Sequence, residues 1–350
     1  MNRILNAARR LTTPLLPSDF LELVNPMWSG SGRAARVISI IDEAPGAATL
    51  QLRPARPLPA HLAGQHLPIG VDIRGVRTWR TYSITSPAGG AAADLCITVK
   101  AVDAGVVSNY LVNDLEVGDL LWIGEPSGEF HLPTAQPQRL LMVAAGGGIT
   151  PIMGMLRTLA NQPNPPLVEL VTVDHSRSDQ IFGAELRELA SSSPWLKLHV
   201  RYTSISGRPT FAEITDQVPD WQELPVWVCG PAGLLEQAQQ HWDRCGDPSQ
   251  LNIERFTPVR AATVGQGGNV TFERSTRQQV VGADTTVLEA GEAAGILMPH
   301  GCRMGICHGC VVPLVEGQVR DIRTGQTHGE PNELIQTCIN APLGDVHIDI

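Results

Sequence analysis

Four cysteines carry the most specific chemical pattern in the sequence. Cys302, Cys307 and Cys310 form a C-x4-C-x2-C run, and Cys338 follows further along the chain. This spacing fits the four thiolate ligands of a [2Fe-2S] cluster, in which three ligands share one loop and the fourth comes from a later segment. A structural zinc site is the alternative, but zinc sites usually pair their cysteines on two short knuckles. The pattern therefore predicts an iron-sulfur centre.

A second pattern, RTYS at residues 80–83, lies between two β-type runs. A guanidinium suits phosphate, an aromatic face suits a flat ring, and a small hydroxyl can approach a redox atom. Further on, GVVS at residues 105–108 follows a strand-like run and opens a helix, where backbone amides can meet a pyrophosphate. An exposed strand and a plain turn are the alternatives when each segment is taken alone.

Together the two segments resemble the ferredoxin-NADP reductase superfamily, whose flavin motifs are R-x-Y-[ST] and G-x-x-[ST]. The resemblance implies that Arg80 contacts the flavin phosphate, Tyr82 lies against the isoalloxazine ring and Ser83 hydrogen-bonds near its N5 atom. FAD is favoured over FMN. The implied flavin-binding residues are Arg80, Thr81, Tyr82, Ser83, Gly105, Val106, Val107 and Ser108.

Two further turns follow apolar strand-like runs and resemble the nicotinamide motifs of the same superfamily, GGGIxP and C-G-P. Glycines let the backbone approach a pyrophosphate, and a helix that begins directly afterwards adds its dipole. The resemblance places the Cys229 thiol beside nicotinamide C4, so Ser83 and Cys229 are the two residues expected at the reacting atoms. The implied nicotinamide-binding residues are Gly146, Gly147, Gly148, Thr150, Pro151, Cys229, Gly230 and Pro231.

The choice between NADPH and NADH depends on groups that could hold a 2′-phosphate. Such groups are expected beyond the ends of the second and third strands of a nucleotide-binding sheet. Ser176 and Arg177 follow the second strand-like run, and Ser204 and Arg208 follow the third. These four residues favour NADPH, although arginines on surface loops are also common without a ligand.

The elements that position these motifs change character along the chain. Short β-type runs separated by Gly and Pro come first, and continuous apolar runs that alternate with amphipathic helices come second. The Cys-rich end resembles a plant-type ferredoxin. The predicted organisation is an extension over residues 1–32, a flavin-binding antiparallel β-barrel over 33–135, an α/β parallel-sheet nicotinamide domain over 136–256, a linker over 257–268 and an α+β β-grasp ferredoxin domain over 269–350.

Composition excludes several other classes of protein. The chain has 350 residues, 43% of them apolar, and a formal charge of −9, which argues against nucleic-acid binding. We find no signal-peptide pattern at the start, and expect a cytoplasmic protein. The extension is expected to pack on its own domain or, alternatively, to bind a membrane surface weakly through residues 1–28, which would place the protein at the inner face of the membrane.

The order of the parts indicates an electron-transfer chain. Hydride carries an electron pair, whereas a [2Fe-2S] cluster passes single electrons, so a flavin is needed between them. The arrangement resembles single-chain NAD(P)H-dependent reductases that feed oxygenases, hydroxylases and desaturases. The N-terminal extension looks similar to reductases of membrane-bound fatty acyl desaturases, and a desaturase is the expected acceptor. A soluble Rieske or di-iron oxygenase is the alternative, and a zinc-binding scaffold without redox function is the alternative from another class.

Overall fold

The structure is a computed structural model that describes residues 27, 34–73, 76–89, 94–103, 105–256, 267–300, 303, 305 and 309–350. Nearly all of the predicted N-terminal extension and linker, together with Cys302 and Cys307, lie outside the described residues. Two compact units are present: Met1–Asp72 with Tyr82–Glu254, and Ile73–Thr81 with Arg255–Ile350. Each is described by itself.

The first sheet is the predicted antiparallel barrel. Its strand order is β4-β3-β6-β1-β2-β5. Ile84, directly after β4, forms a bridge with Ile97 of β5, and Thr85 N donates to Cys96 O at 2.8 Å, so the two edge strands meet and close the sheet. Its elements are β1 (Ala34–Ala44), β2 (Ala47–Pro54), β3 (His66–Ile73), β4 (Val76–Ser83), β5 (Leu95–Lys100), α3 (Val106–Asn109), a π-helix (Tyr110–Asp114) and β6 (Leu120–Ile123).

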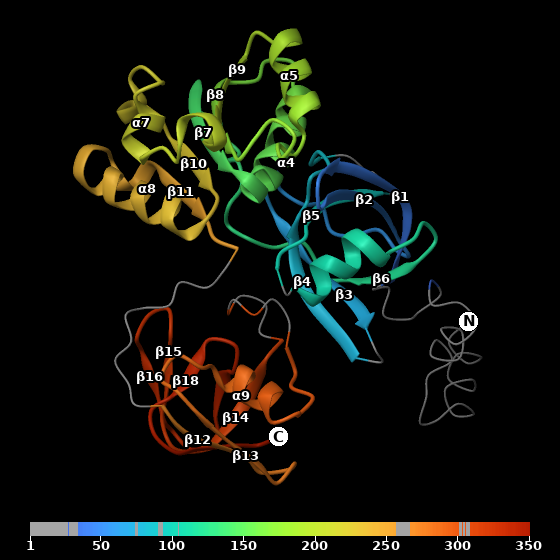
Figure 1. The fold of residues 1–350 in the computed structure, drawn as a ribbon, viewed down its shortest axis with the longest axis vertical. Coiled ribbons are helices and arrows are strands. Elements are labelled where there is room, and N and C mark those ends of the chain that lie inside the picture. Colours follow the sequence, from blue (N-terminus) through green and yellow to red (C-terminus); the bar gives the residue numbers. More distant parts are fainter. Residues whose placement is uncertain are drawn as a thin grey trace, which may run out of the picture. The chain divides into compact units, whose positions relative to one another are not determined.

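The second sheet is parallel and has helices on both faces, as the alternating pattern predicts (Figure 1). Its order is β11-β10-β7-β8-β9. Alternate residues of β7 point to opposite faces: Leu140 and Met142 pack in the cluster that contains α4 and α5, while Leu141 and Val143 pack in the cluster that contains α7 and α8.

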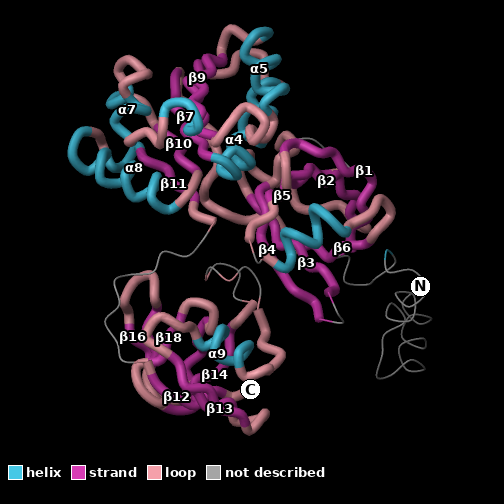
Figure 2. The backbone as a smooth tube through the Cα atoms, viewed as in Figure 1, coloured by secondary structure: helices cyan, strands magenta, loops and turns pink. Residues whose placement is uncertain are grey.

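The strands of this sheet are β7 (Arg139–Ala145), β8 (Leu167–Asp174), β9 (Leu196–Tyr202), β10 (Val226–Cys229) and β11 (Leu251–Glu254). The α-helices are α4 (Ile149–Ala160), α5 (Gly183–Ser192), α6 (Thr203–Ser206), α7 (Phe211–Thr215) and α8 (Ala232–Cys245). Short 3-10 helices span Gly146–Gly148, Trp221–Glu223 and Pro248–Gln250. Figure 2 shows that helices gather around this sheet, whereas strands predominate elsewhere.

The second unit contains the predicted β-grasp arrangement, with sheet orders β13-β12-β19-β14-β17 and β16-β15-β18. Helix α9 starts with a capping box between Thr286 and Glu289. Strand β12 begins at Gly268, so the last residue of the predicted linker already lies in the sheet; a Cβ there would stand 1.8 Å from Gly344 O. The elements are β12 (Gly268–Phe272), β13 (Arg277–Val281), α9 (Val287–Ala293), β14 (Val311–Glu316), β15 (Val319–Asp321), β16 (Thr327–His328), β17 (Glu333–Gln336), β18 (Asn340–Pro342) and β19 (Val346–Ile348).

Within the described part of the chain, no helix combines the length and the apolar character needed to cross a membrane.

Candidate functional site

The predicted flavin motif forms the end of β4 and contains an unsatisfied buried hydroxyl. Ser83 is 3% exposed, and among the described residues its Oγ has no hydrogen-bond partner. Thr81 Oγ1 is also buried without a partner there, while Arg80 Nη1 donates to Trp79 O at 2.8 Å and Tyr82 is half-buried. Buried polar atoms are usually paired in folded proteins, so an unpaired hydroxyl at this position fits a site that a ligand completes.

The predicted pyrophosphate loop is tightly closed at Gly105. A Cβ on this residue would stand 2.4 Å from Ser108 Oγ, so a larger residue would collide with the loop's own side chain. Ser108 Oγ accepts from Val102 N at 3.3 Å and donates to Gly105 O at 3.3 Å. The helix begins at Val106, whose side chain is exposed, whereas Val107 is buried. The Ser108 hydroxyl thus shapes the loop from within.

The two predicted nicotinamide motifs lie against each other although they are far apart in the sequence. Gly148 approaches the β10 end so closely that a Cβ on it would stand 2.1 Å from Cys229 O. Gly230 in turn faces Ala145, with 3.0 Å between its hypothetical Cβ and the Ala145 Cβ. Gly146 has a φ of +51°, a conformation that glycine adopts without strain.

The helix that follows the glycines starts one residue before Thr150. Thr150 Oγ1 donates to Gly147 O at 3.0 Å, and both Thr150 and Pro151 are buried in the first turn of α4. At the other motif, Pro231 is exposed and occupies the N-cap position of α8. Both motifs therefore lead directly from the carboxyl end of a strand into a helix, the edge at which open parallel sheets bind ligands.

Cys229 lies in a fully enclosed environment. Its side chain is 0% exposed, and burial, reinforced by the charge of Glu254, raises the pKa of the thiol well above its usual value. The thiol is therefore neutral at physiological pH. Because Cys229 is fully enclosed, a bound ring could touch its sulfur only after the residues that cover it move apart.

Glu254 and His66 form a buried pair that sequence reasoning missed. Glu254, the last residue of β11, is the register partner of Cys229. Its Oε1 lies 3.2 Å from His66 Nδ1, and among the described residues its Oε2 is buried without a partner. Burial raises the pKa of Glu254, and the bond to His66 opposes that effect. A carboxylate at the carboxyl end of a parallel strand is the signal that could have identified it.

The same pair connects the two sheets near the flavin motif. His66 opens β3, and the residue before it, Gln65, accepts a hydrogen bond from Ile84 N at 2.9 Å. His66 contacts Glu254, Glu254 is the register partner of Cys229, and Gly148 approaches Cys229 O. Ser83 and His66 are connected to each other through the hydrogen bond between their neighbours Ile84 and Gln65. This arrangement can hold a flavin and a nicotinamide close together, as hydride transfer requires.

Helix α4 locks the flavin-binding sheet to the nicotinamide-binding sheet. A Cβ on Gly154 would stand 2.4 Å from Ile84 O, so the helix touches the residue after Ser83. Arg157 donates to Thr85 O at 2.8 Å and forms a bidentate ion pair with Glu185, at 2.8 and 2.6 Å. These contacts fix the glycine loop at the start of α4 relative to the end of β4.

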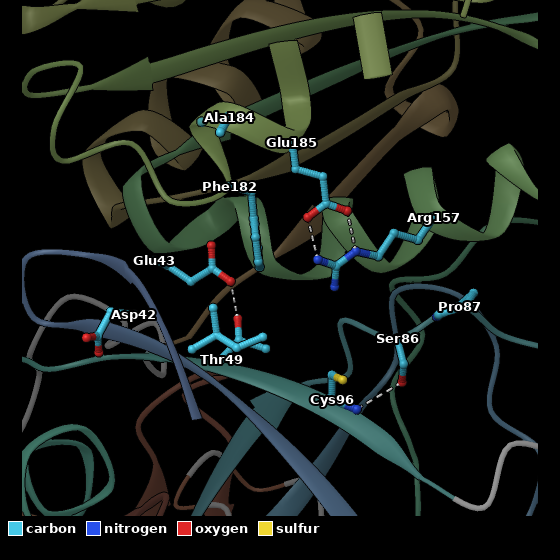
Figure 3. Close-up of a pocket in the computed structure, with 12 residues that line it drawn as sticks. Asp42, Glu43, Thr49, Ser86, Pro87, Cys96, Arg157, Phe182, Ala184 and Glu185 are labelled. Atoms are coloured by element: carbon cyan, nitrogen blue, oxygen red, sulfur yellow. Dashed lines mark hydrogen bonds and ion pairs between the residues drawn. The ribbon is translucent and has the colours of Figure 1, made fainter. Parts of the chain in front are cut away.

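A cavity of about 540 Å³ lies beside this joint (Figure 3). The Arg157–Glu185 pair forms one wall, and Glu43, which accepts a hydrogen bond from Thr49 at 2.6 Å, forms another. The Arg157 guanidinium lies 4.9 Å from the Phe182 ring centroid. The predicted flavin and nicotinamide residues do not line this cavity, so it is separate from the motif cluster.

The residues predicted to hold a 2′-phosphate lie in two segments that the fold brings together, the loop after β8 and the segment after β9, where Ser204 lies in α6 and Arg208 follows it. Ser204 N donates to His175 O at 2.9 Å, which ties the end of β9 to the end of β8. Arg177 and Arg208 are exposed, whereas the Ser176 hydroxyl is engaged with Asp179. The two arginines are therefore available for an anion, and Ser176 already has an acidic partner.

Two of the four predicted cluster ligands lie side by side in the second unit. Cys310 and Cys338 are 1% and 5% exposed, and their sulfur atoms are 3.2 Å apart. Thr337 holds them in register, because its N and Oγ1 donate to Cys310 O at 3.2 and 3.0 Å. Two adjacent buried cysteine sulfurs fit ligands of one metal centre. Gly305, on the same loop, has a φ of +76° and accepts a hydrogen bond from Gln336 at 3.0 Å.

Comparison with known proteins identifies three domains in the predicted order. The family models that match are the oxidoreductase FAD-binding domain over residues 47–132, the oxidoreductase NAD-binding domain over 142–240 and the 2Fe-2S iron-sulfur cluster binding domain over 270–342. An NADPH oxidoreductase of Mycobacterium tuberculosis is 43% identical over 98% of this chain and 91% of its own length.

Two more distant proteins share the whole arrangement. The glycine betaine monooxygenase reductase subunit of Chromohalobacter salexigens is 25% identical over 94% of this chain and 98% of its own length. The solved structure of phthalate dioxygenase reductase, 21% identical, superposes with a TM-score of 0.64 over 91% of this chain and 97% of that one, which shows a shared fold. The protein uses FAD, a [2Fe-2S] cluster and a pyridine nucleotide, and it belongs to the ferredoxin-NADP reductase family of single-chain oxidoreductases with a C-terminal [2Fe-2S] domain.

Proposed function

We propose that this reductase takes electrons from NADPH at the junction of Gly148 and Cys229 and delivers them to a terminal oxygenase. The observation that carries the proposal is the approach of the glycine loop to Cys229 within the unit that also holds Ser83. FAD, when bound, supplies the conversion of a two-electron hydride into single electrons.

Each motif has a proposed task. Arg80 and the Gly105–Ser108 loop bind the flavin phosphates, Tyr82 covers the ring, and the unpaired Ser83 hydroxyl bonds near N5. The segments at 146–151 and 229–231 bind the nicotinamide dinucleotide. The cluster ligands in this proposal are Cys302, Cys307, Cys310 and Cys338.

The preference for NADPH is proposed from the two exposed arginines in the joined segments. A guanidinium that bonds a phosphate typically contributes about 1.5–3 kcal/mol. The name of the mycobacterial relative, an NADPH oxidoreductase, supports this choice. Replacing Arg177 or Arg208 by Ala should lower kcat/KM for NADPH by about 10- to 150-fold, the factor that corresponds to this free energy, and leave kcat/KM for NADH nearly unchanged. Equal wild-type efficiency with both coenzymes would exclude discrimination by either residue.

The acceptor class is proposed from relatives. The Chromohalobacter relative is the reductase subunit of a monooxygenase, and phthalate dioxygenase reductase shares the fold. This support favours the oxygenase alternative over the membrane desaturase expected from the N-terminal extension. The extension itself, apart from Met27, lies outside the described residues, and membrane association through residues 1–28 stays a prediction.

The deciding experiment supplies the purified holoprotein and NADPH to two acceptors, a soluble Rieske oxygenase and a histidine-ligated membrane desaturase in vesicles. Product formation by the oxygenase alone would support the proposal. Product formation by the desaturase alone, lost when residues 1–28 are deleted, would replace it with the desaturase hypothesis.

The cluster is tested separately. We expect Cys310→Ser to abolish NADPH-driven reduction of cytochrome c, which draws on the cluster, and to preserve reduction of ferricyanide, which the flavin can reduce directly. Cys245→Ser, a change at an exposed cysteine, is the matched control and should alter neither rate. Stoichiometric zinc without sulfide in anaerobically purified protein would favour the non-redox scaffold.

A further inference from the structure

Lys100 of the flavin-binding sheet lies at the predicted nicotinamide pyrophosphate loop. It is the last residue of β5, and its Nζ is 3.9 Å from the position that a Cβ on Gly146 would occupy. An ammonium this close to a glycine loop adds a positive charge where a dinucleotide would bring two negative ones. The sequence places Lys100 in a different predicted domain from that loop.

Asp174 is a buried carboxylate at the end of the strand beside the same loop. It ends β8, is 7% exposed, and follows Val173, which pairs with Ala145 directly before Gly146. Among the described residues, no arginine or lysine forms an ion pair with Asp174. Burial raises the pKa of Asp174 to about 6, and the charge of Lys100 opposes that rise.

The other groups around Asp174 are neutral or have a smaller effect on its pKa than Lys100 has. The Gln180 amide lowers the pKa of Asp174 and Asp179 raises it, both from the loop after β8. Tyr202 is its register partner on β9, and its hydroxyl donates to Gln180 at 3.3 Å. His175, the next residue, is exposed. Lys100 is therefore the main positive charge acting on Asp174.

We propose that Asp174 is the counter-charge of Lys100 and takes up a proton from solvent when the dinucleotide's phosphates bind beside Lys100. The phosphates and the buried Asp174 carboxylate are like charges that compete for one ammonium, that of the exposed Lys100. Protonation of the carboxylate removes the competition. The inference rests on the proposed role of the Gly146–Gly148 loop in binding the pyrophosphate.

Bound phosphates disfavour the ionised carboxylate, so the complex binds more protons than the free protein and affinity increases as the pH falls towards 6. Asp174→Asn should bind NADP⁺ about fivefold more tightly than the wild type at pH 8, where Asp174 is ionised, and equally at pH 5. Lys100→Met should weaken binding by about fivefold and reduce its dependence on salt.

Calorimetric titration of the FAD-loaded holoprotein with NADP⁺ at pH 7, in Pipes and in imidazole buffer, measures the protons taken up. The 2′-phosphate of the nucleotide titrates in the same range, so the informative quantity is the difference between the wild type and Asp174→Asn. We expect the wild type to take up more protons, and His175→Gln, the neighbouring control, to retain that excess.

Equal proton uptake by the wild type and Asp174→Asn would overturn the inference, as would a loss of proton uptake in His175→Gln as large as the loss in Asp174→Asn. Failure of NADP⁺ to bind the wild type at any pH would instead overturn the proposed nicotinamide site. The two failures are therefore distinguishable in one data set.

Discussion

The flavin-binding and nicotinamide-binding sheets form their predicted sites by different means. On the nicotinamide side, the backbone of Gly148 packs against the backbone of Cys229. The approach to Cys229 O leaves no room for a methyl group on Gly148. On the flavin side, the predicted contacts depend on side chains of the RTYS strand, and Ser83 Oγ has no partner among the described residues. The nicotinamide site therefore depends on how the backbone packs. In the flavin site, by contrast, a side chain can be replaced without disturbing the fold.

The largest expected effect is at Gly148. Gly148→Ala forces a Cβ to within 2.1 Å of Cys229 O, so we expect the free energy of unfolding to fall by about 3 kcal/mol and NADPH oxidation to be lost. Gly147→Ala is the matched control, because nothing lies within 4 Å of its hypothetical Cβ, and its stability should change by less than about 0.5 kcal/mol. Denaturant unfolding measures both, and similar losses in the two variants would contradict the steric argument.

The joint between the sheets comes next. Arg157→Ala removes a bidentate ion pair with Glu185 and the bond to Thr85 O, and should cost about 2–3 kcal/mol of unfolding free energy. Flavin reduction by NADPH should slow because α4 is released from the residues after Ser83. Arg53→Ala breaks a similar bidentate pair with Asp94 on the exposed surface and should have a much smaller effect. Equal destabilisation would show that α4 does not fix the joint.

On the flavin side, Arg80→Ala should weaken flavin binding by about 1.5–3 kcal/mol, the range for a hydrogen bond to a charged group. Fluorescence of flavin released on dialysis measures this loss. Arg77→Ala, an exposed arginine on the same strand, is the control and should keep its flavin. Full retention of flavin in Arg80→Ala would mean that another residue anchors the phosphate.

The smallest effect on stability is expected at Ser83. Ser83→Ala removes a buried hydroxyl that has no partner among the described residues, so unfolding of the apoprotein should change by less than about 0.5 kcal/mol. Stopped-flow measurement should nevertheless show slower flavin reduction by NADPH. Ser86→Ala removes a hydroxyl that accepts from Cys96 N at 3.1 Å, and should do the reverse: a loss of stability with an unchanged reduction rate.

Much of the fold and of the site could be predicted because the informative residues are close together in the sequence. The cysteine spacing, the three glycines after an apolar strand and the alternation of apolar strands with helices each lie within a short window. The resemblance that these motifs support predicted the three domains and their cofactors correctly. The expected desaturase acceptor had no such basis, because it depended on an extension without mechanistic residues.

The contacts that sequence reasoning missed form between residues that are far apart in the sequence and meet only in the folded protein. His66 and Glu254 meet across 188 positions, so the place of Glu254 at a strand end could indicate a polar site but not its partner. In the sequence, Lys100 is an ordinary residue at the end of a strand. Only the fold brings its ammonium close to the glycine loop. In the sequence, Gly154 is a residue that weakens a helix. In the fold, its lack of a side chain lets α4 contact Ile84 O. Such contacts are set by strand order and by helix packing, which local patterns do not encode.

The position of β19 has a consequence for how the ferredoxin part is made. This strand lies between β12 and β14 and pairs in parallel with β12, so the centre of the sheet contains the strand that the ribosome synthesises after all its neighbours. Cys310 and Cys338 both precede it. The sheet therefore closes after translation of both cysteines, through a contact of long sequence separation that folds slowly. During synthesis, the nicotinamide-binding sheet can therefore fold while Cys310 and Cys338 still belong to an unfolded segment.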